Sequence, residues 1–322
     1  MLAVAAGDRL LTLADPSAEP AVHPLPADAT CLAADGAALL VGAREGLFVG
    51  PPGDMTPAFD GHVTAVTIGP DGTRWVGTEP SAVFRSRPDE DGWTACADLT
   101  DLPSAGSWAF PPRPDTHHVR WIAVAPDDPN CLYVAVEAGA LVRSTDGGAS
   151  WRDRTPDGPR DTHSATTHPD RPDTLYAAAG DGFAVTPDRG DSWTFAEDGL
   201  DRTYCWSVAV DPSAPDRLLL AAAPGARAAH RRPADAAVFR REPGAPWERT
   251  GLPTDDATRP VLAADGPGRC WAADDDGVCL TENWGETWTR VAETPVESAV
   301  AGVATVGSSP QDSGPSPVES GR

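Results

Sequence analysis

Lysine is absent from this sequence, and every one of its 25 basic residues is an arginine. Against these stand 48 acidic residues, mostly aspartate, which give a formal net charge of −23 at neutral pH. A surface of this sign repels nucleic acid and anionic lipid, so neither is expected as a partner. Dense carboxylates also keep a protein hydrated where salt screens charge, which indicates a halophilic protein of a high-salt cytosol.

Three further absences narrow the class of protein. No stretch approaches the roughly 18 consecutive apolar residues of a membrane-spanning helix. No basic segment followed by an apolar one opens the chain, so no secretory signal is expected. The six cysteines form no C-x-x-C pair, and four of them fall in predicted strands, which favours buried, reduced thiols. Together these absences predict a cytoplasmic protein that does not associate with membranes.

What the chain does contain is one eight-residue pattern, [ST]-x-[DN]-x-G-x-[ST]-W, at residues 144–151, 186–193 and 281–288. Its Asp or Asn can hydrogen-bond the backbone of its own turn, and its Gly tolerates a positive φ. Its Trp offers a large apolar surface to a neighbouring sheet. We therefore predict structural rather than catalytic roles for Asp146, Trp151, Asp188, Trp193, Asn283 and Trp288.

The pattern belongs to a longer repeat. A degraded copy ends at Trp247, and the copies follow one another at intervals of roughly 40 to 55 residues, a period typical of propeller blades. Short apolar strands separated by Pro, Asp and Gly turns suit four-stranded blades. Six such units are predicted, at residues 28–60, 61–100, 115–160, 162–200, 203–253 and 257–295.

The two ends of the sequence predict a seventh unit. Residues 1–25 lack a first strand, whereas residues 297–306 read as a first strand without a blade. Pairing them closes the ring and removes two sheet edges. We expect an all-β fold, a seven-bladed propeller of four-stranded antiparallel blades, as one domain over residues 1–307, with six or eight blades as alternatives. Residues 308–322, rich in Ser, Pro and Gly, are predicted to be disordered.

The three copies of the eight-residue pattern, called boxes from here on, resemble the Asp-boxes of BNR repeat propellers. That family includes sialidases, xyloglucanase-like glycosidases, sortilin-type receptors and a photosystem II assembly factor. Residues 77–82 and 117–121 also resemble stretches of prokaryotic Asp-box proteins labelled glycosyl hydrolases. The resemblance implies the fold over nearly the whole chain, but fold alone does not define an activity. Sialidases add an Arg-Ile-Pro motif that this sequence lacks, so a true sialidase is not expected.

In such a blade, the innermost strand starts at the same mouth of the ring where the turn between the second and third strands lies. The box turns lie at the opposite face. Residues at the first mouth are unusually polar and aromatic here, so we expect them to converge on an axial pocket. Glu137 and His163 are the predicted catalytic pair, for proton transfer. The predicted ligand-binding residues are His117, His118, Arg120, Trp121, Tyr204, Trp206, Arg227, His230 and Arg259.

Other interpretations of these residues stay open. A salt bridge between Glu137 and Arg120, and core packing of Trp206, are structural alternatives. A divalent metal is another, because the side chains are of suitable types although no H-x-x-x-H or H-E-x-x-H spacing supports it. Residues 107–114, a proline-stiffened loop, are expected either to cover the pocket or to shield a blade edge. The candidate metal ligands are His118, His163, His230 and Glu137.

Three functions are therefore compatible with the sequence. The first is a hydrolase or lyase acting on a sugar-like or anionic small molecule. The second is a non-catalytic interaction scaffold, resembling the photosystem II assembly-factor branch, with a protein partner. The third is a metal-assisted enzyme, resembling propeller lactonases and streptogramin lyases, with a divalent ion as cofactor.

Overall fold

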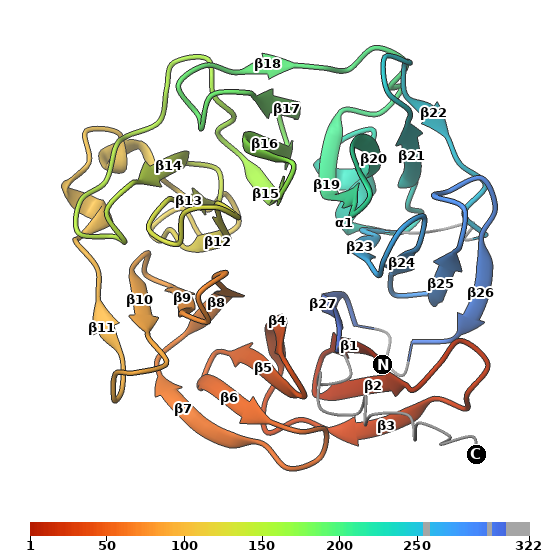
Figure 1. The fold of residues 1–322 in the computed structure, drawn as a ribbon, viewed down its shortest axis with the longest axis horizontal. Coiled ribbons are helices and arrows are strands. Elements are labelled where there is room, and N and C mark those ends of the chain that lie inside the picture. Colours follow the sequence, from red (N-terminus) through yellow and green to blue (C-terminus); the bar gives the residue numbers. More distant parts are fainter. Residues whose placement is uncertain (254–257, 295–297, 307–322) are drawn as a thin grey trace, which may run out of the picture.

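The computed structural model describes residues 1–253, 258–294 and 298–306. Its strands form seven sheets arranged radially around a central axis, as Figure 1 shows, so the chain is a seven-bladed β-propeller. The predicted fold class is confirmed, and each of the six predicted units contains one sheet. The tail predicted at residues 308–322 lies outside the described residues.

The first blade is built from both ends of the chain. It contains β1 (Leu2–Ala6), β2 (Arg9–Leu13) and β3 (Ala21–Pro24), with β27 (Val300–Thr305) as its innermost strand. β27 pairs antiparallel with β1. The N-terminal amino group donates to the Val306 carbonyl at 3.0 Å. The predicted closure of the ring is therefore confirmed.

The other blades follow in chain order, and within each one the strands run from the axis outwards. Blade two contains β4 (Ala29–Asp35), β5 (Ala38–Ala43), β6 (Gly46–Gly50) and β7 (Thr56–Asp60). Blade three contains β8 (Val63–Ile68), β9 (Arg74–Thr78), β10 (Val83–Ser86) and β11 (Thr94–Ala95). Blade four contains β12 (Val119–Val124), β13 (Leu132–Val136) and β14 (Ala140–Ser144). Its fourth strand is reduced to one bridge between Arg143 and Arg152.

The remaining blades have four strands each. Blade five contains β15 (Thr162–His168), β16 (Arg171–Ala179), β17 (Gly182–Thr186) and β18 (Thr194–Phe195). Blade six contains β19 (Tyr204–Asp211), β20 (Ala214–Ala223), β21 (Ala237–Arg241) and β22 (Glu248–Arg249). Blade seven contains β23 (Val261–Ala264), β24 (Cys270–Ala273), β25 (Val278–Thr281) and β26 (Thr289–Ala292). The helical segments are η1 (Leu99–Asp101), η2 (Ala105–Ser107) and α1 (Ala226–His230).

The hydrophobic core is divided among the blade interfaces. Each pair of neighbouring blades buries its own apolar cluster. Because a blade is covered on both faces, its second strand reads as a continuous apolar run, as in β13 (LYVAV), where every residue is buried. All six cysteines are free thiols and five are buried, as expected. The described residues include no helix with the length and apolar character that a bilayer crossing needs.

The boxes have the structural role predicted for them. The Asp188 carboxylate accepts hydrogen bonds from the Ser192 N–H at 2.8 Å and the Ser192 hydroxyl at 2.6 Å. Asp146 accepts the same two bonds from Ser150, whereas the Asn283 side chain accepts from the Thr287 N–H and donates its NH₂ group to the Thr287 hydroxyl. Two box indoles, Trp151 and Trp288, donate to the preceding blade. Trp193 packs against the cluster between blades four and five.

Candidate functional site at one mouth of the axial channel

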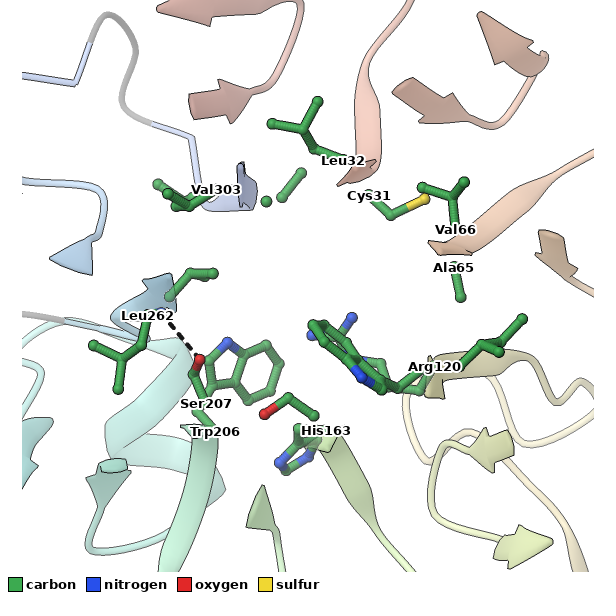
Figure 2. A pocket seen from close by; sticks show the side chains of 17 residues that line it. Cys31, Leu32, Ala65, Val66, Arg120, His163, Trp206, Ser207, Leu262 and Val303 are labelled. Atoms are coloured by element: carbon green, nitrogen blue, oxygen red, sulfur yellow. Dashed lines mark hydrogen bonds between the residues drawn. The ribbon is translucent and has the colours of Figure 1, made fainter. Parts of the chain in front are cut away.

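The same irregularity recurs near the start of most innermost strands. One extra residue interrupts the pairing with the second strand in the first six blades, which is a β-bulge. Bulges re-aim side chains and are common beside functional sites. In blades four, five and six the extra residues are Arg120, His163 and Trp206. Figure 2 shows Arg120 and Trp206 extending into the axial space, whereas the fully buried His163 ring lies beside the strand ends, against the Cys205 carbonyl of blade six.

The bulged residue also links neighbouring blades. Thr30 and Thr64 each donate their hydroxyl to a carbonyl of the next innermost strand, at 2.5 and 2.6 Å. His163 occupies the equivalent place, and its Nδ1 lies 2.6 Å from the Cys205 carbonyl oxygen. Because a carbonyl only accepts, Nδ1 carries the proton and Nε2 is left with a lone pair toward the mouth. An imidazole therefore replaces a hydroxyl and adds a second functional atom.

Glu137 is the buried carboxyl of this mouth. It directly follows β13, its backbone N–H donates to the His118 carbonyl, and its side chain is 10% exposed. Its Oε2 lies 3.2 Å from Arg120 Nε and 3.7 Å from His118 Nε2. Burial raises the pKa of Glu137 to about 7, which the charge of Arg120 only partly offsets. The salt bridge considered from the sequence is thus present, at a carboxyl that titrates near neutrality.

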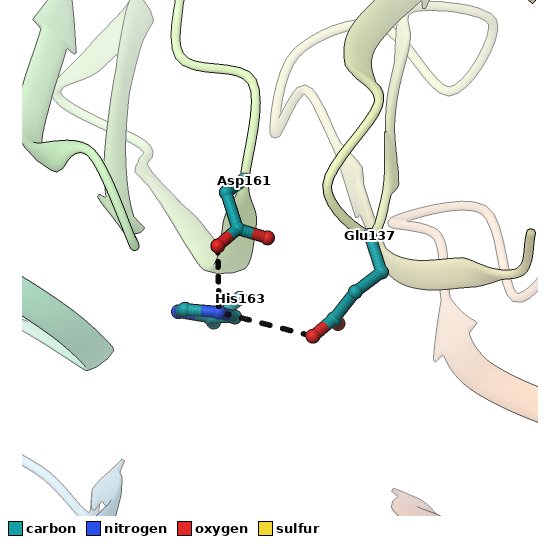
Figure 3. Close-up of side chains that lie close together, drawn as sticks. All are labelled: Glu137, Asp161 and His163. Carbon is teal, nitrogen blue, oxygen red and sulfur yellow. Dashed lines mark ion pairs between the residues drawn. The ribbon is translucent and has the colours of Figure 1, made fainter. Parts of the chain in front are cut away.

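His163 lies between two carboxyl groups, as Figure 3 shows. Its Nε2 is 3.6 Å from Asp161 Oδ2 and 3.9 Å from Glu137 Oε1. Burial lowers the pKa of His163 to about 3, so the ring is neutral. Burial also raises the pKa of Asp161, although the Ala138 N–H bonds its other oxygen at 2.9 Å. Three hydrogen-bond acceptors therefore converge on one small volume.

Two arginines stack against one indole beside this group. The guanidinium carbons of Arg120 and Arg259 lie 4.8 and 5.1 Å from the Trp206 ring centroid. Arg259 also lies 2.9 Å from Nδ1 of His230, whose Nε2 is 3.4 Å from the Tyr204 hydroxyl. Partial desolvation, followed by the charge of Arg259, lowers the pKa of His230 to about 4. The arginines therefore carry the positive charge here, and His230 stays neutral.

The loop predicted at residues 107–114 lies against the same mouth. Phe110 contacts the His118 ring edge-on, with centroids 4.9 Å apart. Arg113 binds both carboxylate oxygens of Glu79, at 2.5 and 2.7 Å. Burial lowers the pKa of His118 to about 4, so this ring is neutral as well. The loop therefore borders the site through its contacts with His118 and Glu79.

Two adjacent cavities, which share lining residues, occupy the axis beyond the bulged residues. A cavity of about 70 Å³ is lined by Arg120, His163 and Trp206 on one side. A wider one, of about 570 Å³, continues toward the opposite mouth. Trp121 lines both, and its indole N–H donates to the Ala165 carbonyl. Trp206 is half-buried against this space, so it is a wall of the channel rather than part of the core.

Most residues predicted from the sequence meet at this mouth. Those in contact with one another are Glu137, His163, His118, Arg120, Tyr204, Trp206, His230 and Arg259. His117 instead packs against Trp108, and Trp121 lies deeper in the channel. Arg227 is exposed on α1, and no contact of its side chain with the group is found among the described residues. Sequence reasoning missed the convergence of Asp161, although its place two residues before His163 could have indicated it.

The comparisons with known proteins agree on the fold. No family profile matches the sequence, and no curated protein matches it. An ancestral GH74 enzyme superimposes with a TM-score of 0.64 at 16% identity, over 89% of this chain and 40% of that enzyme. Virginiamycin B lyase from Staphylococcus aureus gives 0.60 at 15% identity, over 89% of each chain. Ycf48 from Cyanidioschyzon merolae gives 0.58 at 15%, over 86% of this chain and 88% of Ycf48.

These three proteins are similar to the chain in architecture. The chain spans well under half of the GH74 enzyme, whereas it matches the lyase and Ycf48 over nearly their whole lengths. At this level of identity the likeness defines a seven-bladed propeller of GH74-like and Ycf48-like form and leaves the activity open.

Proposed function

We propose that the chain is an enzyme of the hydrolase or lyase type that acts on a small anionic molecule at this axial mouth. The observation that carries the proposal is the pair of guanidinium groups, Arg120 and Arg259, stacked on Trp206 beside the buried carboxyl of Glu137. Guanidinium groups are the preferred ligands of carboxylates and phosphates. A structural role in holding the blades together would not require two guanidinium groups on the same indole.

Hydrogen-bond accounting supports an anion at this place. Within the described residues, Arg259 forms no ion pair with a carboxylate, and its buried Nε has no hydrogen-bond partner. Arg120 approaches Glu137 through Nε at 3.2 Å, and no hydrogen bond of its terminal N–H groups is found among the described residues. A bound anion would satisfy these donors and fix its own position over Trp206.

We place the reacting end of the bound molecule next to the side chains of Glu137 and His163. A carboxyl that titrates near neutrality and a neutral imidazole with a free lone pair are both suited to accept a proton. Their nearest polar atoms, Nε2 and Oε1, lie 3.9 Å apart, and the other oxygen of Glu137 lies 3.2 Å from Arg120. This arrangement supports bond cleavage next to the anionic group, by elimination or by attack of water.

Chromogenic nitrophenyl esters and glycosides that carry a carboxylate or phosphate, assayed in molar KCl, test this proposal. Glu137→Gln is expected to lower kcat at least about 100-fold, because it removes a proton acceptor. Arg259→Gln is expected to raise KM about 10-fold or more, because a charged hydrogen bond is lost. Arg231→Gln, an exposed arginine near the same mouth, is the control. Turnover by Glu137→Gln and Arg259→Gln equal to wild type would refute the assignment.

A second candidate is a non-catalytic scaffold that binds a peptide. It is favoured by the near-complete overlap in length with Ycf48, one structure of which holds a D1 peptide. The two candidates differ in the same assays. A scaffold would turn over none of the substrates and would bind an extended peptide in calorimetry, with affinity unchanged by Glu137→Gln.

A further inference from the structure

We propose that Glu137, Asp161 and His163 form a binding site for one divalent transition-metal ion. One imidazole nitrogen and two carboxylate oxygens, all within 4.8 Å of one another, are its ligands. The inference rests on the proposed function only for the place of the reacting end. With an ion bound, Nε2 of His163 and Oε1 of Glu137 would be its ligands and no longer proton acceptors, so ion binding and the assigned proton transfer are alternative uses of these atoms.

Two of the three side chains, His163 and Asp161, are anchored by a hydrogen bond at one atom and present another. His163 is held through Nδ1 by the Cys205 carbonyl, and Asp161 through Oδ1 by the Ala138 N–H. Glu137 lies against Arg120 through Oε2. The remaining atoms, Nε2, Oδ2 and Oε1, point toward a common volume (Figure 3). Outer partners that fix the ring and the carboxylates in this way are the usual support of a metal site.

The imidazole at position 163 packs against Trp206 and Tyr204, with ring centroids 4.5 and 4.9 Å away, but the bridge to the next blade does not itself require an imidazole. Threonine makes the same bridge to the next blade at positions 30 and 64, with a hydroxyl donor. A fully buried imidazole costs more to desolvate than a threonine and contributes one additional atom, the Nε2 acceptor. That atom faces the two carboxylates.

The electrostatics of the group call for a positive charge at its centre. Nε2 of His163 faces the two carboxylate oxygens at 3.6 and 3.9 Å, and all three acceptors lie within 4.8 Å of one another, so they repel unless a proton or a cation lies between them. Within the described residues the one hydroxyl near Nε2 is that of Tyr204, at a long 3.3 Å. Oε2 of Glu137 is buried without a hydrogen bond, although Arg120 is close. A divalent ion satisfies all three acceptors at once.

The donor set selects the class of ion. Imidazole suits first-row transition metals, and two carboxylates suit hard divalent ions, so Mn²⁺ and Zn²⁺ fit one nitrogen with two oxygens. Ca²⁺ and Mg²⁺ prefer oxygen alone. Three protein ligands leave positions of the ion open toward Arg120 and Arg259, where an anionic group would bind next to it.

The Asp161→Asn variant distinguishes loss of metal binding from loss of folding. Its amide oxygen can still accept the Ala138 N–H, and its NH₂ group can donate to Nε2 of His163, but the metal-binding oxygen is gone. Its melting temperature without metal is therefore expected to equal or exceed that of wild type. Asp89→Asn, an exposed carboxylate without a described partner, controls for ions held by the acidic surface.

The experiment is calorimetry with Mn²⁺ alone and with Zn²⁺ alone in molar KCl, after treatment with a chelator and dialysis. We expect one ion per chain in wild type and in Asp89→Asn, with affinity at least about 10-fold lower in Asp161→Asn and Glu137→Gln. Electron paramagnetic resonance of Mn²⁺ should report nitrogen coordination that is lost in His163→Gln.

Absence of saturable binding by wild type, or equal affinity of wild type and Asp161→Asn, would overturn the proposal. Because binding is measured without substrate, its failure is distinguishable from failure of the proposed function. Turnover by a protein that binds no metal would support the proposed function and refute the metal site. Metal binding without turnover would support the metal site and refute the proposed function.

Discussion

At the scale of single residues, this chain uses carboxylates for two opposite purposes. Asp188 is exposed and accepts three hydrogen bonds from Thr186 and Ser192, and its pKa is lowered to about 2, first by the Ser192 hydroxyl. Glu137 is buried with little hydrogen bonding, and its pKa is raised. A carboxylate whose lone pairs are occupied cannot exchange protons near neutral pH, so the box stabilises structure and leaves chemistry to the mouth.

The box carboxylates should make stability depend on acid. A group whose pKa is lowered by folding stabilises the protein above its unfolded pKa, and this stabilisation is lost as pH falls through the folded value. Urea midpoints measured from about pH 4 down to about pH 2 should therefore fall less in Asp188→Asn than in wild type. At neutral pH, Asp188→Ala should cost about 1–2 kcal/mol of unfolding free energy and Asp188→Asn less, since Asn283 fills the third box. Equal acid sensitivity of wild type and Asp188→Asn would contradict this.

At the scale of elements, the sequence predicts the blades well and the bulges not at all. The box recurs with a fixed period, and a strand buried on both faces has a recognisable apolar run, so six blades could be bounded to within a few residues. A bulge adds a single residue to one strand, and no particular residue type marks it in these strands. The strand alternation that places Arg120, His163 and Trp206 on the axis therefore becomes visible only in the pairing register.

Ring closure by β27 can be tested by truncation. A chain that ends before Val300 loses the pairing with β1 and leaves the edge of β1 uncovered, and lost backbone bonds of ~0.5–1.5 kcal/mol each amount to at least about 3 kcal/mol. Denaturant unfolding should show this loss together with reduced cooperativity. The matched control ends after Val306, which keeps every pairing of β27 and the bond from the N-terminal amino group. Equal midpoints for the two truncations would show that β27 does not close the ring.

At the scale of the whole molecule, the site exists only because four blades meet. Glu137 comes from blade four, His163 from blade five, Trp206 from blade six and Arg259 from the segment before β23 of blade seven, and no local motif links them. The residue types and the shared mouth could be predicted once the propeller was recognised. The contacts could not, because they depend on blade tilt, on the bulges and on Asp161, whose anchoring to Ala138 crosses between blades.

The net charge of −23 is also a property of the whole molecule, and it sets the last prediction. Repulsion among surface carboxylates destabilises the compact state, and salt shortens its range from about 10 Å at 0.1 M to about 3 Å at 1 M. Raising KCl over this range should therefore raise the melting temperature on the order of 5 to 10 °C.

A charge-reduced variant is the matched control for this salt effect. It replaces five exposed carboxylates that have no described partner by amides: Glu19, Asp28, Asp89, Asp91 and Asp115. With less repulsion to screen, it should melt higher than wild type at low salt and gain less from KCl. Parallel salt curves for the two proteins would mean that KCl acts through hydration of apolar surface, and that the acidic composition serves solubility alone.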